Sequence, residues 1–417
     1  MNYFKNFGII LIYLILILYS LEFLTLIFLK KEINFNQLSF DELKKIKIDE
    51  YSKNNFFERR TRIENFLQEK DEFNLKPTFR YSGYFFNLFD QNNMIKNFIQ
   101  KKQKLVPFRG PFNSNVLGSN EDGVREIMFN DKFGFKNKNT VYQDKIDLMI
   151  IGDSFTEGVP FGNDIHVANL INNKSNFNAL NYGVSGTGPL MSLAIIKEYG
   201  KHFYPKDVFY LFYEGNDLTD MMHEKESFLI NYLENDNFNQ NLIENSHHLD
   251  DFFQEYEKIF YQIINYREKN LPNNNIEVKK NSKKFKEKIK DFLEINNLKE
   301  LLLVGSVFNR TEIDYDMFRN ILDKMQTETK SWGGNLNFVY LPSWIRYNNK
   351  ISLANFKHQK KVEKIVLDLN INYIDIVEKF KNNKMNSVNS FHLGIYGHYK
   401  KKGYELVANE ILNKIKK

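Results

Sequence analysis

The sequence predicts an α/β fold, a three-layer α/β/α sandwich around a mostly parallel five-stranded sheet. Short apolar runs of strand-forming residues recur along the chain, and segments with helical spacing separate them. The runs cover residues 148–151, 179–183, 207–213, 335–341 and 371–376. Because strands alternate with helices in this rhythm, we expect parallel pairing with right-handed crossovers.

The helical segments of this predicted domain show apolar residues at helix spacing. They cover residues 164–172, 190–199, 315–329 and 403–416, and a further helix is expected over 252–265. In the last segment of the chain, Val407, Ile411 and Ile415 lie on one side of the expected helix. These helices would cover the two faces of the sheet.

The first predicted strand stops abruptly at Gly152-Asp153-Ser154. In open α/β sheets, ligands bind at the carboxyl ends of the strands. A serine on a tight strand-to-helix turn exposes its hydroxyl there, as a nucleophile requires. The alternative is a turn without any further role.

Other polar groups are expected at the same edge of the sheet. The second strand is followed by a glycine-rich turn from Gly183 to Gly188, the third by Asn216, and His398 precedes the terminal helix. Histidine is the usual base that takes the proton of a serine nucleophile. The backbone N–H groups of Ser154 and Gly186 and the Asn216 amide could stabilise a developing oxyanion.

These residues form blocks whose order and spacing resemble the SGNH (GDSL-like) hydrolases. The blocks are Gly152-Asp-Ser-Phe, Asn181-x-Gly-x-Ser-Gly186, Gly215-Asn-Asp and His398-x4-Gly403. The resemblance covers residues 120–415 and implies that Ser154 is the nucleophile and His398 the general base. It further implies an oxyanion hole made of Ser154, Gly186 and Asn216. The amino-acid sequence around Glu214 and Pro342 resembles the membrane-linked branch of this family, which is found with bacterial surface-polysaccharide genes.

One position departs from the family pattern. The family has an aspartate three residues before the histidine, and here that position is Ile395. Asp375 and Asp217 are alternative acids that the sequence does not rank, and a backbone carbonyl could orient the ring instead. His392 is a second candidate base, which we rank behind His398 because no amphipathic helix follows it.

The amino terminus carries an almost wholly apolar run over residues 7–29, in which Glu22 is the only charge. Such a run is long enough to span a bilayer. No small-residue cleavage site follows it, so we predict an uncleaved anchor within residues 1–31. We expect the following domain on the periplasmic or extracytoplasmic side of the membrane, although the flanking lysines do not decide the orientation.

Composition limits the remaining possibilities. The chain has 417 residues, of which 42% are hydrophobic, with no cysteine and a formal net charge of +6. Cysteine chemistry is therefore excluded, and the basic residues do not form the aromatic-interleaved patch of a nucleic-acid binder. We predict a helical stalk or packing layer over residues 32–107, a hydrolase-like domain over 108–417, and a helical insertion over 221–300.

Together these observations predict a serine-dependent esterase that needs no metal or cofactor. The resemblance implies an O-acyl group, expected to be O-acetyl, on a surface glycan as substrate. An O-acetyltransferase with the same serine and histidine is one alternative. A non-catalytic glycan-binding or assembly protein is another, favoured by the absence of the motif acid.

Overall fold

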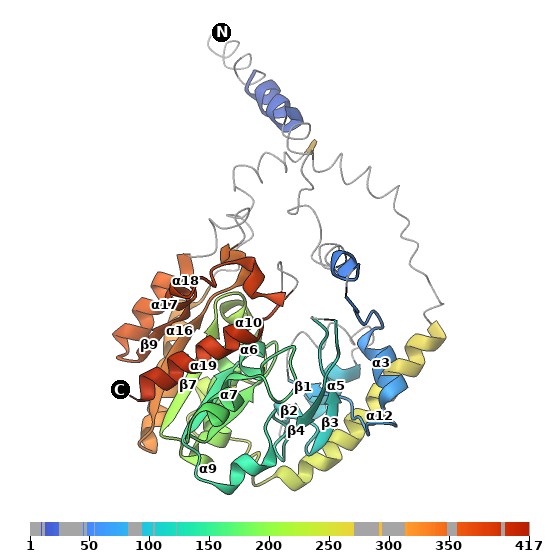
Figure 1. Cartoon of the computed structure of the whole chain (residues 1–417), viewed down its shortest axis with the longest axis vertical. Helices are drawn as coiled ribbons and strands as arrows, with labels where there is room; N and C mark the ends of the chain where they lie inside the picture. Colours follow the sequence, from blue (N-terminus) through green and yellow to red (C-terminus); the bar gives the residue numbers. More distant parts are fainter. Residues whose placement is uncertain are drawn as a thin grey trace. The chain divides into compact units, whose positions relative to one another are not determined.

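The computed structural model (Figure 1) forms two compact units. One comprises residues 1–46 and 267–312, and the other, which carries the predicted site, comprises residues 47–266 and 313–417. The structure describes residues 10, 13–24, 45, 48–53, 55–81, 94–102, 105–121, 123–270, 292–293, 313–347, 357–392 and 397–416.

In the first unit, residues 13–24 are helical and the Tyr19 hydroxyl donates a hydrogen bond to the Leu293 carbonyl oxygen at 3.0 Å. Among the residues that the structure describes, no helix is both long and apolar enough to cross a membrane. Apart from residue 10, the remainder of the predicted 7–29 span lies outside the described residues, as do the predicted motif position Ile395 and most of residues 271–300.

The second unit contains the predicted parallel sheet, with strands in the order β6-β5-β7-β8-β9. Its strands are β5 (Leu148–Gly152), β6 (Ala179–Gly183), β7 (Asp207–Tyr213), β8 (Asn335–Leu341) and β9 (Asn372–Asp375). All four pairings are parallel, and Gly152 at the end of β5 stands opposite Gly183 at the end of β6. The prediction of a parallel five-stranded sheet is therefore confirmed, and the polar strand ends share one edge.

Helices cover both faces of this sheet, because alternate side chains of each buried strand point to opposite sides. Met149 and Ile151 belong to a core cluster with α8 (Pro189–Ile195), α16 (Tyr315–Ser331) and α17 (Lys357–Asp368). Leu148 and Ile150 belong to the opposite cluster. That cluster includes α7 (Val167–Lys174), α18 (Ile376–Asn382) and α19 (Lys401–Ile415).

The helices differ from the predicted ranges mainly at their ends. His166 caps α7, with its Nδ1 accepting the Asn169 N–H at 3.2 Å, so this helix begins later than predicted. The predicted helix over 190–199 continues from α8 into a π-helical turn, Ile196–Gly200, and a short α9, Lys201–Phe203. The terminal helix begins at Lys401 rather than at Gly403.

Segments before β5 and between β7 and β8 in sequence build an additional layer. It comprises α3 (Arg62–Glu69), α5 (Met94–Lys101), α12 (Ser246–Asn270), the β1–β2 ribbon (Phe79–Arg80 and Arg109–Gly110) and the β3–β4 ribbon (Ser114–Leu117 and Ile127–Asn130). Between α12 and β1, the rings of Phe252 and Phe79 meet edge to face with centroids 5.0 Å apart. Phe66 of α3 meets Phe260 of α12 in the same way at 5.3 Å. Aromatic packing thus joins residues 62–80 and the predicted insertion to the larger core cluster.

The remaining described elements are short. They are α6 (Ser154–Glu157), α10 (Asp217–Glu224), α11 (Ile230–Glu234) and the 3₁₀ turns Asn139–Gln143, Trp344–Tyr347 and Val388–Ser390. Of these, α6 and α10 begin at the carboxyl ends of β5 and β7. Both therefore lie at the edge of the sheet where the predicted site residues gather.

Gly183 lets α6 approach the end of β6. A methyl group at Gly183 would collide with the backbone nitrogen of Glu157 and lie 2.6 Å from the carbonyl carbon of Thr156. We expect Gly183→Ala to lower the free energy of unfolding by about 3 kcal/mol or more, at the upper end of overpacking costs. Urea denaturation measures the loss. At the control position Gly333, with a φ of +82° and no atom within 4 Å, alanine should cost roughly 1 kcal/mol. Equal losses at the two positions would contradict the steric explanation.

Candidate active site

Ser154 is the first residue of α6, directly after β5. Asp153 caps this single helical turn, with its Oδ1 accepting the Phe155 N–H at 2.8 Å. Gly158 ends the turn in the left-handed region, at φ +78°. The local sequence thus folds because a capping aspartate begins the turn and a glycine ends it.

The structure brings Ser154 together with His398, which lies 244 positions later in the chain. His398 Nε2 is 2.6 Å from Ser154 Oγ. The His398 ring also packs on the ring of Phe155, with centroids 4.6 Å apart. The predicted nucleophile and the predicted base are therefore in direct hydrogen-bonding contact.

The acid that orients His398 is Glu121, which the sequence analysis missed. Glu121 Oε1 lies 2.7 Å from His398 Nδ1, and Glu121 Oε2 accepts the backbone N–H of the same histidine at 2.8 Å. A carboxylate at Nδ1 requires the proton on that nitrogen, so Nε2 is left to accept the Ser154 proton. The three side chains form a continuous serine–histidine–glutamate chain.

Neither acid proposed from the sequence takes this position, and both are used elsewhere. Asp375 caps α18 through the N–H groups of Val377 and Glu378. Asp217 is buried and accepts the Tyr210 hydroxyl at 2.9 Å. Because these bonds fix each carboxylate to another partner, the two candidates are wrong for the role of ring-orienting acid.

The alternative base, His392, contacts Phe161 and the backbone of His398. Its ring packs against Phe161, with centroids 5.3 Å apart, and its N–H donates to the His398 carbonyl oxygen at 3.1 Å. His392 therefore supports the backbone of His398. The geometry favours His398 over His392 as the base, in the order that the sequence suggested.

A tight turn holds Glu121. The Asn120 side chain accepts the Gly123 N–H at 3.0 Å and donates to the Glu58 carbonyl oxygen at 2.5 Å. The Glu58 N–H donates to the Gly123 carbonyl oxygen at 2.8 Å. The Asn-Glu-Asp-Gly sequence indicated a turn here, but nothing in it indicated that the turn meets a histidine 277 positions away.

Glu121 and His398 shift one another's pKa in the directions expected of an ion pair. Burial lowers the pKa of His398, but the charge of Glu121 and its hydrogen bonds outweigh burial, so the net pKa lies above the usual value. Burial raises the pKa of Glu121, and His398 reverses this, so the net pKa of the carboxyl lies below the usual value. The pair is therefore arranged to hold a proton on the imidazole once the serine releases it.

The predicted oxyanion donors lie on turns at the same sheet edge. Gly186 adopts φ +74° in the turn after β6, and the Ser154 N–H begins α6. The Asn216 side chain, by contrast, already donates from Nδ2 to Asp220 Oδ2 at 2.6 Å. The N–H groups of Ser154 and Gly186 are thus the predicted donors that this arrangement leaves to the reacting carbonyl, because the Asn216 side chain is also hydrogen-bonded to Asp153.

Acidic side chains gather around Asn216. Burial raises the pKa of Asp153 to about 6 and that of Asp220 to about 7, and hydrogen bonds from Asn216 oppose both shifts. Burial also raises the pKa of Asp217 well above its usual value. Among the residues that the structure describes, no group of three or more histidine, cysteine, aspartate or glutamate side chains is arranged to hold a metal ion.

A search of solved structures finds chains with a distant likeness to this one. No protein-family model matches the sequence. No curated protein matches it either. A lipolytic protein of the G-D-S-L family from Veillonella parvula is 13% identical, with a TM-score of 0.35 over 65% of this chain and 99% of that chain. A catalytic mutant of Axe2, an acetylxylan esterase from Geobacillus stearothermophilus, is also 13% identical, with a TM-score of 0.36 over 65% and 94%.

These sequence identities and TM-scores are too low to indicate the activity of this chain. The fold and the site of this chain define a class of protein, a parallel α/β sandwich with a serine–histidine–glutamate chain at the carboxyl edge of the sheet. In the arrangement of its four sequence blocks, the chain resembles the SGNH (GDSL-like) hydrolases.

The contact between Glu121 and His398 predicts a measurable shift. In Glu121→Gln the carboxylate charge is lost, and we expect the pKa of His398 to fall because burial is then opposed only by the smaller effects of Asp153 and Glu157. An NMR pH titration of the labelled histidines measures this change. Asp375→Asn serves as the control, since Asp375 caps α18, and should leave the His398 titration unchanged. An unaltered His398 pKa in Glu121→Gln would argue against the ion pair.

Proposed function

We propose that the chain is a serine-dependent ester hydrolase of the SGNH type. The observation that carries this proposal is the hydrogen-bonded chain from Ser154 through His398 to Glu121, with distances of 2.6 and 2.7 Å. A serine hydroxyl becomes a useful nucleophile when an oriented base accepts its proton. A turn serine without a catalytic role needs neither a histidine nor an acid behind it.

The reaction follows from these positions. Ser154 Oγ attacks the ester carbonyl carbon while its proton passes to His398 Nε2, and Glu121 stabilises the imidazolium that forms. The N–H groups of Ser154 and Gly186 receive the negative charge on the carbonyl oxygen. Collapse of this intermediate expels the alcohol, which takes the proton from His398. Water then attacks the acyl-serine by the same route and releases the acid.

The proposed substrate is an O-acyl group, specifically O-acetyl, on a surface glycan. Its support is the resemblance of the sequence around Glu214 and Pro342 to the membrane-linked polysaccharide branch. An O-acetyltransferase would use the same residues, with a sugar hydroxyl replacing water. The alternative of a non-catalytic binding protein was favoured by the missing motif acid. Glu121 contacts the ring of His398, so this reason no longer favours it.

We expect ester turnover by the full chain in detergent, measured with p-nitrophenyl acetate. Ser154→Ala and His398→Ala should each lower kcat by roughly 10³-fold or more, because nucleophile and base act as one unit. Ser192→Ala is the control: this buried serine lies on α8, away from the serine–histidine–glutamate chain, and should keep full activity.

Further readouts separate the alternatives. Covalent labelling of Ser154 by a fluorophosphonate without hydrolysis, together with acetyl transfer to an added sugar, would favour the transferase. Absence of both turnover and labelling would sink the esterase proposal. Acetate release from sugar acetates, compared with p-nitrophenyl acetate, tests the glycan substrate.

A membrane anchor over residues 7–29 is part of the same proposal, with the domain on the extracytoplasmic side. It is supported by the length and apolarity of this run in the sequence. We expect the full chain to remain in the membrane fraction after alkaline carbonate washing, and a chain without residues 1–31 to be released. Release of the full chain would contradict the anchor, and protease accessibility in intact cells tests the side.

A further inference from the structure

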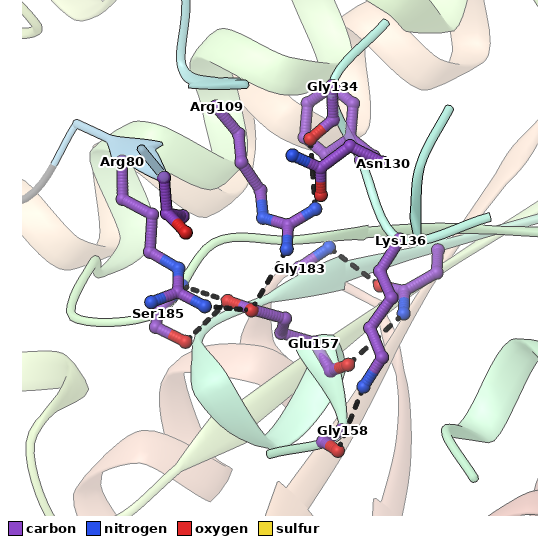
Figure 2. Close-up of polar contacts among 12 residues, drawn as sticks. Arg80, Arg109, Asn130, Gly134, Lys136, Glu157, Gly158, Gly183 and Ser185 are labelled. Carbon is purple, nitrogen blue, oxygen red and sulfur yellow. Dashed lines mark hydrogen bonds and ion pairs between the residues drawn. The ribbon is translucent and has the colours of Figure 1, made fainter. Parts of the chain in front are cut away.

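A buried carboxylate that the reaction does not use lies behind the site. Glu157, the last residue of α6, is fully buried. Its Oε1 receives hydrogen bonds from Arg80 and, at 3.1 Å, from Arg109. Its Oε2 receives the Ser185 N–H at 3.1 Å and the Ser185 hydroxyl. Figure 2 shows Glu157 between the two arginines, with Ser185 beside it.

These contacts saturate Glu157. A carboxylate has about four acceptor sites, and here four donors from three other segments occupy them. Arg80 lies on β1 and Arg109 on β2, whereas Ser185 lies in the turn after β6. Arg109 is itself fixed, because it also donates to the Gly134 carbonyl oxygen at 2.9 Å. The carboxylate therefore has a single well-defined position.

The charges around Glu157 keep it ionised. Burial raises its pKa, but Arg80 and Arg109 outweigh burial, so the net pKa lies far below the usual value of a glutamate. A charged carboxylate is a stronger hydrogen-bond acceptor than a neutral one. It therefore holds the Ser185 N–H and hydroxyl throughout the neutral pH range.

This network connects two turns of the candidate active site, the one that begins with the nucleophile and the one that holds the predicted oxyanion donor. Glu157 is three residues after Ser154 on the same helical turn, and Ser185 directly precedes Gly186. We propose that Glu157, clamped by Arg80 and Arg109, is a positioning residue that sets the Ser185–Gly186 turn as an oxyanion donor relative to the Ser154 nucleophile. The carboxylate acts through Ser185 and touches no reacting atom.

This inference rests on the proposed esterase function for its kinetic readout, but not for its structural readout. In the full chain, the network predicts that the Ser185 amide is protected from hydrogen exchange, because its N–H is bonded to Glu157. Glu157→Gln removes the charge that holds this amide, so its exchange should become roughly tenfold faster or more. Exchange in β5 and β7 should not change. This measurement needs no substrate.

The kinetic readout is the division between kcat and KM for p-nitrophenyl acetate. A misplaced Gly186 N–H weakens transition-state binding, so Glu157→Gln should lower kcat by about 10²-fold, toward the loss seen on removing an oxyanion donor, and leave KM unchanged. The pH at which His398 titrates should remain the same, because Glu121 is untouched. Ser185→Ala, which removes one of the four donors, should have a smaller effect of the same kind.

A double-mutant cycle tests whether Glu157 acts through Ser185. If it does, Ser185→Ala added to Glu157→Gln should cost little further activity, whereas independent effects would multiply. Ser192→Ala, a serine on α8, is the matched control for loss of a hydroxyl and should alter neither exchange nor kcat. If Glu157→Gln does not fold, Ser185→Ala alone carries the exchange and kcat measurements, because Ser185 is only half-buried.

The outcomes separate this inference from the esterase proposal. Wild-type kcat and exchange in Glu157→Gln, or multiplying effects in the cycle, would overturn the positioning role while the esterase stands. A wild-type chain without turnover or labelling would overturn the esterase. If Glu157→Gln then leaves exchange at Ser185 unchanged, the positioning role is overturned as well, whereas faster exchange in this variant would support it.

Discussion

Two hydrogen bonds between the Glu121 carboxylate and His398 join the segment before the parallel sheet to the segment before the terminal helix, and the site depends on them. They fix both the backbone and the ring of the histidine, and hence the nitrogen that faces Ser154. The Glu121 turn is in turn held by the Asn120 side chain and by the backbone of Glu58. The segment before the first sheet strand is therefore a working part of the site.

The surroundings of the nucleophile turn differ in charge from one side to the other. Arginines and the buried Lys136, whose pKa is lowered by burial to about 7, surround Glu157 behind the Ser185 turn. Acids surround Asn216 on the side of β7, including Asp153 and Asp220 with raised pKa values. Negative charge that develops on a substrate is therefore better accommodated toward the Ser185 turn than toward Asn216.

The sheet was predictable because its strands are buried on both faces and therefore appear as unbroken apolar runs, as in residues 207–213. Ser154 and His398 were predictable because motif spacing marks them. Glu121 was not, since its contact spans 277 positions and a turn sequence does not reveal its tertiary partner. The Asn216–Asp220 bond was missed because one helical turn of separation says nothing about the rotamer that each side chain takes.

The Glu157 cluster is easier to explain by geometry than by stability. Each buried ion costs several kcal/mol in lost hydration, and a well-packed apolar replacement of a buried ion pair is often neutral or stabilising. Two arginines share this one carboxylate, so three ions lose their hydration in the cluster. An apolar side chain at position 157, however, could not receive the Ser185 N–H and hydroxyl. Only an acceptor at the end of α6 ties the oxyanion turn to the same short helix that begins with the nucleophile, so that neither can move without the other.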